Sequence, residues 1–152
     1  MDIESLLKLL NDRAADYVII GAAAMPVHGY TRITLDLDLF IRPTAVNAAK
    51  VLDSLREFGY DLTDFSVQDL LENKILIRQY VVETDIHPSV KGVSFDQVWE
   101  HRVADYYGKT PAQFASLEDL IQMKEAANRP KDQEDLRVLR ELLRRRDKPP
   151  PK

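Results

Sequence analysis

Two aspartates, Asp36 and Asp38, lie one residue apart inside an apolar segment that continues to Ile41. If this segment is a strand, its side chains alternate between faces, so both carboxylates point the same way. Two like charges on one half-buried face repel each other and lose hydration unless a cation or hydrogen-bond donors compensate. A divalent cation with oxygen ligands is the usual compensation, and Mg2+ commonly brings phosphate groups with it. The pair therefore predicts metal-dependent chemistry on a phosphate-bearing substrate.

The sequence around this pair follows a recognisable order. An apolar run from Val18 ends at Gly21-Ala22, and residues 23–35 separate this turn from Asp36. An apolar strand, a turn of small residues, a short helix and an Asp-x-Asp strand resemble the signature of the nucleotidyltransferase superfamily, which has a polymerase-beta-like fold. The segment HGYTRITLDLDLF is similar to small stand-alone bacterial members, among them minimal nucleotidyltransferases and the AbiEii-type abortive-infection group. The segment SLEDLIQMKEAANRPKDQEDLRVL resembles the closing helices of the family, so the resemblance covers roughly Tyr17 to Leu143.

This resemblance implies transfer of a nucleoside monophosphate from ATP or another NTP to an acceptor hydroxyl, with release of pyrophosphate. It implies Mg2+ or Mn2+ as cofactor and three carboxylates as catalytic residues and metal ligands: Asp36, Asp38 and Asp85. Asp85 matches the third-carboxylate position of the family, where it would act with the metal ions on the acceptor hydroxyl. Glu83, which shares its strand parity, is the alternative.

The resemblance also implies a set of nucleotide-binding residues: Gly21, Ala22, Arg32 and Lys124. The family usually has Gly or Ser where this chain has Ala22, which lacks a hydroxyl for a phosphate, although backbone N–H groups can still bind one. Arg32 could contact a triphosphate or form an ion pair with Asp36. Lys124 is favoured because its apolar neighbours suggest a partly buried helix. His28 is expected to pack or cap, and His87 and His101 lack metal-ligand spacing with each other.

The elements that would position these residues predict an α/β fold, with a small mixed sheet flanked by helices and a C-terminal helical pair. Strands are expected over 17–21 and 36–41, with Leu35 on the core face, over 74–80 and 81–86, and around 105–110. Helices are expected over 2–15, 22–28, 43–58 (inner stripe from Val46 to Leu55), 66–72, 95–103, 116–127 and 131–145. One domain is predicted over residues 1–147, followed by a disordered tail over 148–152.

Composition is ordinary for a globular protein: 152 residues, 45% hydrophobic, 30% charged and a net charge of −4. The absence of cysteine excludes disulfides and thiolate metal sites. The chain has no apolar run long enough to span a membrane and no basic signal-peptide start. A cytoplasmic protein without membrane contact is expected.

The acceptor stays open at this stage. The small size favours either a large acceptor, such as tRNA or a protein, or a small molecule bound at a homodimer interface. Likeness to the abortive-infection group would imply a toxin with an antitoxin partner, whereas likeness to short antibiotic-modifying members would imply an acidic pocket for a cationic drug. A non-catalytic interaction module that retains the fold is the third reading, and Ala22 is its best support.

Overall fold

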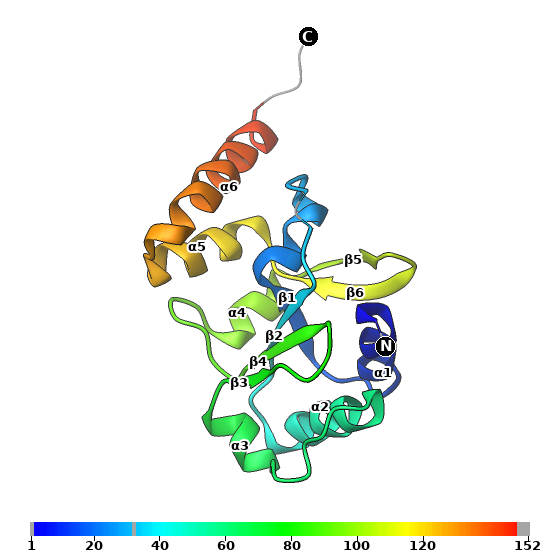
Figure 1. Ribbon diagram of the computed structural model, residues 1–152. Helices are drawn as coiled ribbons and strands as arrows, with labels where there is room; N and C mark the ends of the chain where they lie inside the picture. Colours follow the sequence, from blue (N-terminus) through cyan, green and yellow to red (C-terminus); the bar gives the residue numbers. More distant parts are fainter. Residues whose placement is uncertain (1, 32, 149–152) are drawn as a thin grey trace.

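The computed structural model of the chain describes residues 2–31 and 33–148. A six-stranded mixed sheet lies at its centre, in the order β3-β4-β2-β1-β6-β5 (Figure 1). Its strands are β1 (Tyr17–Ile20), β2 (Asp36–Ile41), β3 (Ile75–Ile77), β4 (Glu83–His87), β5 (Val103–Tyr107) and β6 (Thr110–Phe114). The pairs β2–β4 and β1–β6 are parallel, and the other three neighbouring pairs are antiparallel. The predicted small mixed sheet is confirmed.

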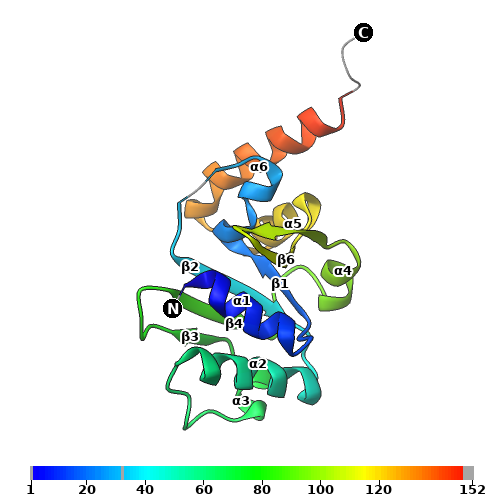
Figure 2. The same cartoon turned by 90° about the vertical axis from the view of Figure 1, so that its right-hand side faces the viewer.

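The helices lie on both sides of this sheet. They are α1 (Ile3–Asp12), α2 (Ala45–Phe58), α3 (Val67–Glu72), α4 (Phe95–Glu100), α5 (Leu117–Ala127) and α6 (Gln133–Arg146). Helices α1 and α2 cover one face, whereas α4 and α5 lie on the opposite side, and α5 and α6 form the predicted C-terminal pair (Figures 1 and 2). No helix among the residues described is both long and apolar enough to cross a membrane.

Strand β2 separates its polar and apolar side chains by alternation. The apolar residues of one face are fully buried: Leu37, Leu39 and Ile41. Asp36, Asp38 and Phe40 share the other face, where the ring of Phe40 packs edge-on against Phe95 of α4, with 5.2 Å between centroids. The aspartates therefore point to the side of the sheet that carries α4 and α5.

Two predicted core positions are wrong. Leu35 precedes the strand, which begins at Asp36, and its side chain is 56% exposed. In α2 the buried apolar stripe follows helical spacing through Ala48, Val51, Leu52, Leu55 and Phe58. Val46 lies off this stripe and is 72% exposed. It comes two residues before Ala48, which is a rotation of about 200° around the helix, so its side chain points away from the stripe.

Several connections are tighter than predicted. The segment expected as one helix over 22–28 forms two 3-10 turns, Gly21–Ala24 and Pro26–His28, and Gly29 ends the second with a φ of +95°. The expected strand near 105–110 is a hairpin of β5 and β6 that turns at Gly108. The two strands predicted over 74–80 and 81–86 are present as β3 and β4, which are shorter than predicted and pair antiparallel. The predicted tail lies outside the described residues, apart from Lys148.

Candidate functional site

The centre of the candidate site is the parallel pair of β2 and β4. In this register Asp38 lies beside Asp85, and Asp36 lies beside Glu83. Because each pair belongs to neighbouring strands and has the same parity, all four carboxylates lie on one face. The sequence predicted the Asp-x-Asp strand and a third acid on a neighbouring strand, and the sheet brings the two strands into direct contact.

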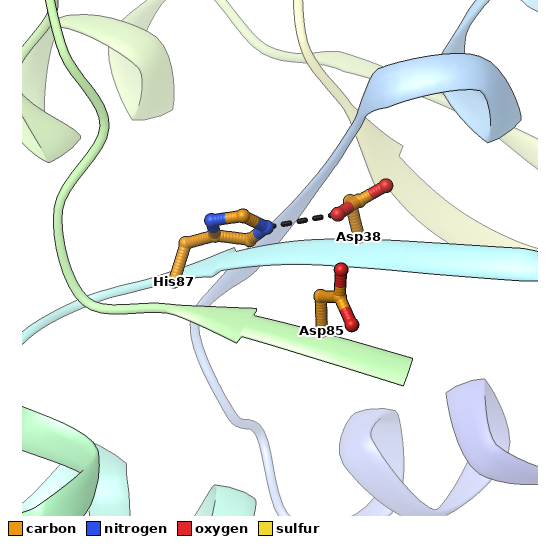
Figure 3. Close-up of side chains that lie close together, drawn as sticks. All are labelled: Asp38, Asp85 and His87. Carbon is orange, nitrogen blue, oxygen red and sulfur yellow. Dashed lines mark hydrogen bonds and ion pairs between the residues drawn. The ribbon is translucent and has the colours of Figure 1, made fainter. Parts of the chain in front are cut away.

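A histidine joins this group. His87 follows Asp85 by two residues in β4, and its Nε2 lies 2.9 Å from Oδ1 of Asp38. Asp38, Asp85 and His87 each offer one ligand atom, and these atoms lie within 4.8 Å of one another (Figure 3). Among the described residues, these three form the group that could hold a metal ion.

The donor set fits a divalent cation. Two carboxylates on adjacent strands are partly buried, so their repulsion is only partly screened by water, and a cation between them would relieve it. Carboxylate oxygens suit Mg2+ and Mn2+, whereas an imidazole nitrogen also suits Zn2+ and other transition metals. The group is therefore chemically able to hold Mg2+ or Mn2+, with His87 either as a ligand or as the partner that orients Asp38.

His87 was not among the predicted site residues. It lacks metal-ligand spacing with His101, which lies elsewhere and hydrogen-bonds Asp119 of α5 at 3.1 Å. The available signal was strand parity: in ETDIH the side chains of Glu83, Asp85 and His87 alternate onto one face.

Asp36 occupies a different position from the other two predicted aspartates. It is the first residue of β2, it is exposed, and its backbone N–H donates to Thr34 Oγ1 at 3.0 Å. Its side chain lines the same cleft as Asp38, yet it is not one of the three closely spaced ligand groups.

Gly21 connects β1 to the first 3-10 turn directly above Asp38. Its φ is +69°, a conformation that residues with a side chain rarely adopt. A Cβ placed on Gly21 would lie 2.7 Å from Oδ2 of Asp38, so a side chain here would displace the carboxylate. Gly21 and Ala22 both line the cleft, and Arg32, the third predicted nucleotide contact, lies outside the described residues.

Lys124 of α5 reaches the cleft from the C-terminal helical pair. Its side chain is 15% exposed, and Nζ lies 3.3 Å from Asp132 Oδ1 and 3.3 Å from Asp135 Oδ2. Arg129 donates to both Asp132 oxygens, from Nε at 2.7 Å and from Nη2 at 3.0 Å. Lys124 therefore forms ion pairs with two acids at the start of α6.

This cluster makes the free energy of unfolding depend on pH in the acidic range. The hydrogen-bonded Arg129 guanidinium, with Lys124 nearby, lowers the pKa of Asp132 from 3.8 to about 2. Because the folded-state pKa is depressed, the stabilisation is complete above about pH 4 and is lost as the pH falls toward 2. At pH 7 we expect Asp132→Asn to lower the free energy of unfolding by roughly 1.5–3 kcal/mol. Urea unfolding measured from pH 7 to pH 2.5 should show that the difference in free energy of unfolding between wild type and variant becomes smaller. A difference that does not change with pH would contradict a stabilising role of the Asp132 carboxylate.

These groups surround one cleft of about 660 Å3 between the sheet and the C-terminal helices. Its cationic residues are Lys74, Arg78, Lys91, Lys124, Arg129 and Lys131. Its acidic residues are Asp36, Asp38, Asp85, Asp132 and Asp135. Asp36, Asp38 and Asp85 lie on the sheet side, and cations from both the sheet and the helical end surround them, an arrangement suited to a metal ion that accompanies a polyphosphate.

Comparison with known proteins agrees with this geometry. A family model described as a nucleotidyltransferase of unknown function (DUF6036) matches residues 1–145, nearly the whole chain. A search of the curated proteins finds no match.

Proposed function

Because the chain belongs to this family of nucleotidyltransferases, we propose that it transfers a nucleoside monophosphate from an NTP to an acceptor hydroxyl in a metal-dependent reaction. The acceptor oxygen would attack the α-phosphorus, the bond to the bridging oxygen would break, and pyrophosphate would leave. The single observation that carries this proposal is the convergence of Asp38, Asp85 and His87 at the base of a cation-walled cleft.

Each part of the cleft has a role in this proposal. Asp38 and Asp85 would hold Mg2+ or Mn2+, with His87 beside them and Asp36 at the rim. The bound ion would stabilise the charge that develops on the phosphate oxygens. Asp85 would also accept the proton of the acceptor hydroxyl. Gly21, Ala22 and Lys124 would face the triphosphate, and Lys124 would be oriented for this by Asp132 and Asp135.

The mixed charge of the cleft argues against a cationic acceptor. Six cationic residues line it against five acidic ones, whereas a site for a cationic drug would need an acidic lining. An RNA such as tRNA is therefore the favoured acceptor class, and a protein is the next. Action as a toxin, neutralised by an antitoxin partner, is compatible with such an acceptor and remains part of the proposal.

The test is transfer of label from each of the four α-labelled NTPs, with Mg2+ or Mn2+, to total RNA, to a protein lysate or to a cationic aminocyclitol. We expect labelled RNA with wild type and none with Asp38→Asn. Label on protein would support the same reaction with a protein acceptor. Label on the aminocyclitol would favour the alternative in which the protein modifies a cationic drug. Absence of transfer together with absence of metal binding would leave a non-catalytic interaction module.

His87 gives a separate prediction for the metal. If His87 binds the ion or orients Asp38, His87→Gln should weaken Mn2+ binding by about 10- to 100-fold. Equilibrium dialysis measures this affinity directly. His101→Gln removes another histidine that hydrogen-bonds an aspartate, away from this cleft, and should leave Mn2+ affinity unchanged. Equal Mn2+ affinities for wild type and both variants would show that His87 takes no part in metal binding.

A further inference from the structure

Arg78 lies against the acidic face of the site, in the segment that links β3 to β4. Its Nη1 donates to Asp85 Oδ1 at 2.6 Å, and its Nε lies 3.3 Å from Glu83 Oε2. The antiparallel register explains this position: Leu76 pairs with Asp85 and Ile77 with Thr84, so the next residue, Arg78, reaches the face that carries both acids. Arg78 was not among the predicted site residues.

The guanidinium is held from more than one side. Besides Asp85 and Glu83, Nη1 donates to the backbone carbonyl of Ile77 at 3.2 Å. An arginine side chain stays protonated in proteins, so the positive charge beside Asp85 and Glu83 is permanent. Among the described residues Nη2 has no acceptor, and its two N–H groups remain available to phosphate oxygens.

The acids of this face differ in whether an arginine neutralises them. Glu83 and Asp85 are compensated by Arg78, whereas the ion pair of Asp38 within the described part of the chain is with His87. A second divalent ion on Glu83 and Asp85 would have to displace an arginine held by three acceptors, or lie beside a fixed positive charge. A single ion held by Asp38 and the remaining oxygen of Asp85 would leave both ion pairs of Arg78 in place.

We propose that the Arg78 guanidinium takes the place of one of the two metal ions usual in nucleotidyl transfer, so that the site binds a single divalent ion. This inference rests on the proposed function. Arg78 would contribute a planar hydrogen-bond donor to the phosphate oxygens, and the ion at Asp38, Asp85 and His87 would contribute the other positive charge. Arg78 is then a charge-supplying residue of the site, and Asp85 joins the two cations.

The experiment counts Mn2+ ions bound per chain by equilibrium dialysis, with Mn2+ alone as the probe. We expect one ion for wild type, one for Arg78→Lys, which keeps the charge, and two for Arg78→Ala, which frees Glu83 and Asp85. Lys74→Ala removes another cleft cation and should leave the count at one.

The outcomes separate this inference from the proposed function. Two ions on wild type, or one ion on Arg78→Ala, would overturn the role of Arg78 and leave a metal-dependent enzyme. Absence of bound Mn2+ from every variant would overturn both. Arg78 is 44% exposed, so Arg78→Ala should fold, and thermal unfolding checks this.

Discussion

Replacement of Asp38 by asparagine should reduce nucleotidyl transfer by more than about 100-fold while leaving the chain folded. Asparagine keeps the size of the side chain and removes the charge that a divalent ion needs from its ligand. The Oδ1 of Asp38 also lies 2.9 Å from Nε2 of His87, and asparagine keeps an oxygen for this contact but not the charge. Substitution of residues that only support a metal ligand typically costs about 10- to 100-fold, and loss of a ligand should cost more.

The measurement is the initial rate of label transfer from an α-labelled NTP at saturating metal. Asp53→Asn is the matched control, because Asp53 is an exposed aspartate of α2, which covers the other face of the sheet. Urea unfolding should show a change below about 1 kcal/mol for Asp38→Asn, as for a partly exposed ion pair. Transfer at the wild-type rate by a folded Asp38→Asn protein would place the chemistry elsewhere.

Replacement of Gly21 by alanine should impair both stability and activity. The left-handed backbone at φ +69° costs an alanine roughly 1–2 kcal/mol. Its Cβ would also lie 2.7 Å from Asp38 Oδ2, and the carboxylate must move. Because displacement of a reacting group by about 1 Å can cost about 100-fold in rate, we expect a loss of that order in transfer.

Gly29 is the control that separates these two effects. It also has a positive φ, +95°, but a Cβ there would meet only Leu142 Cδ2 at 3.8 Å, an ordinary contact. Gly29→Ala should therefore lower the free energy of unfolding by a similar amount and retain most of the transfer rate. If the two variants lost activity equally, the close approach of Gly21 to Asp38 would have no catalytic consequence.

Signals that depend on neighbouring residues along the chain gave reliable predictions. Helices were predicted to begin at residue 116 and to end at residue 58. Ser116 caps the first, because its Oγ accepts from the Asp119 N–H at 3.1 Å, and Gly59 ends the second with a φ of +118°. The alternation that buries Leu37 and exposes Asp36 follows from the strand period alone, which fixes faces without any knowledge of the partner strand.

Features that depend on which strands become neighbours could not be predicted in the same way. Nothing local to Arg78 indicates that the β3–β4 register places its guanidinium on Asp85. The contact of His87 with Asp38 likewise depends on parallel pairing across more than forty residues of chain. Leu35 shows the same difficulty at a strand end, because alternation predicts the face of a residue but does not show where the strand begins.

The parallel β2–β4 pair has a consequence for how this protein acquires its site. Parallel neighbours require a crossover, and α2, α3 and β3 all lie between the two strands in the chain. Asp38 and Asp85 therefore meet only after this long connection has closed, so an unfolded chain has no metal site. Any ion bound by the native state alone shifts the folding equilibrium, by about 2.7 kcal/mol at 100 times its Kd. In the proposed reaction, the cation would thus also act as a ligand that favours the folded state.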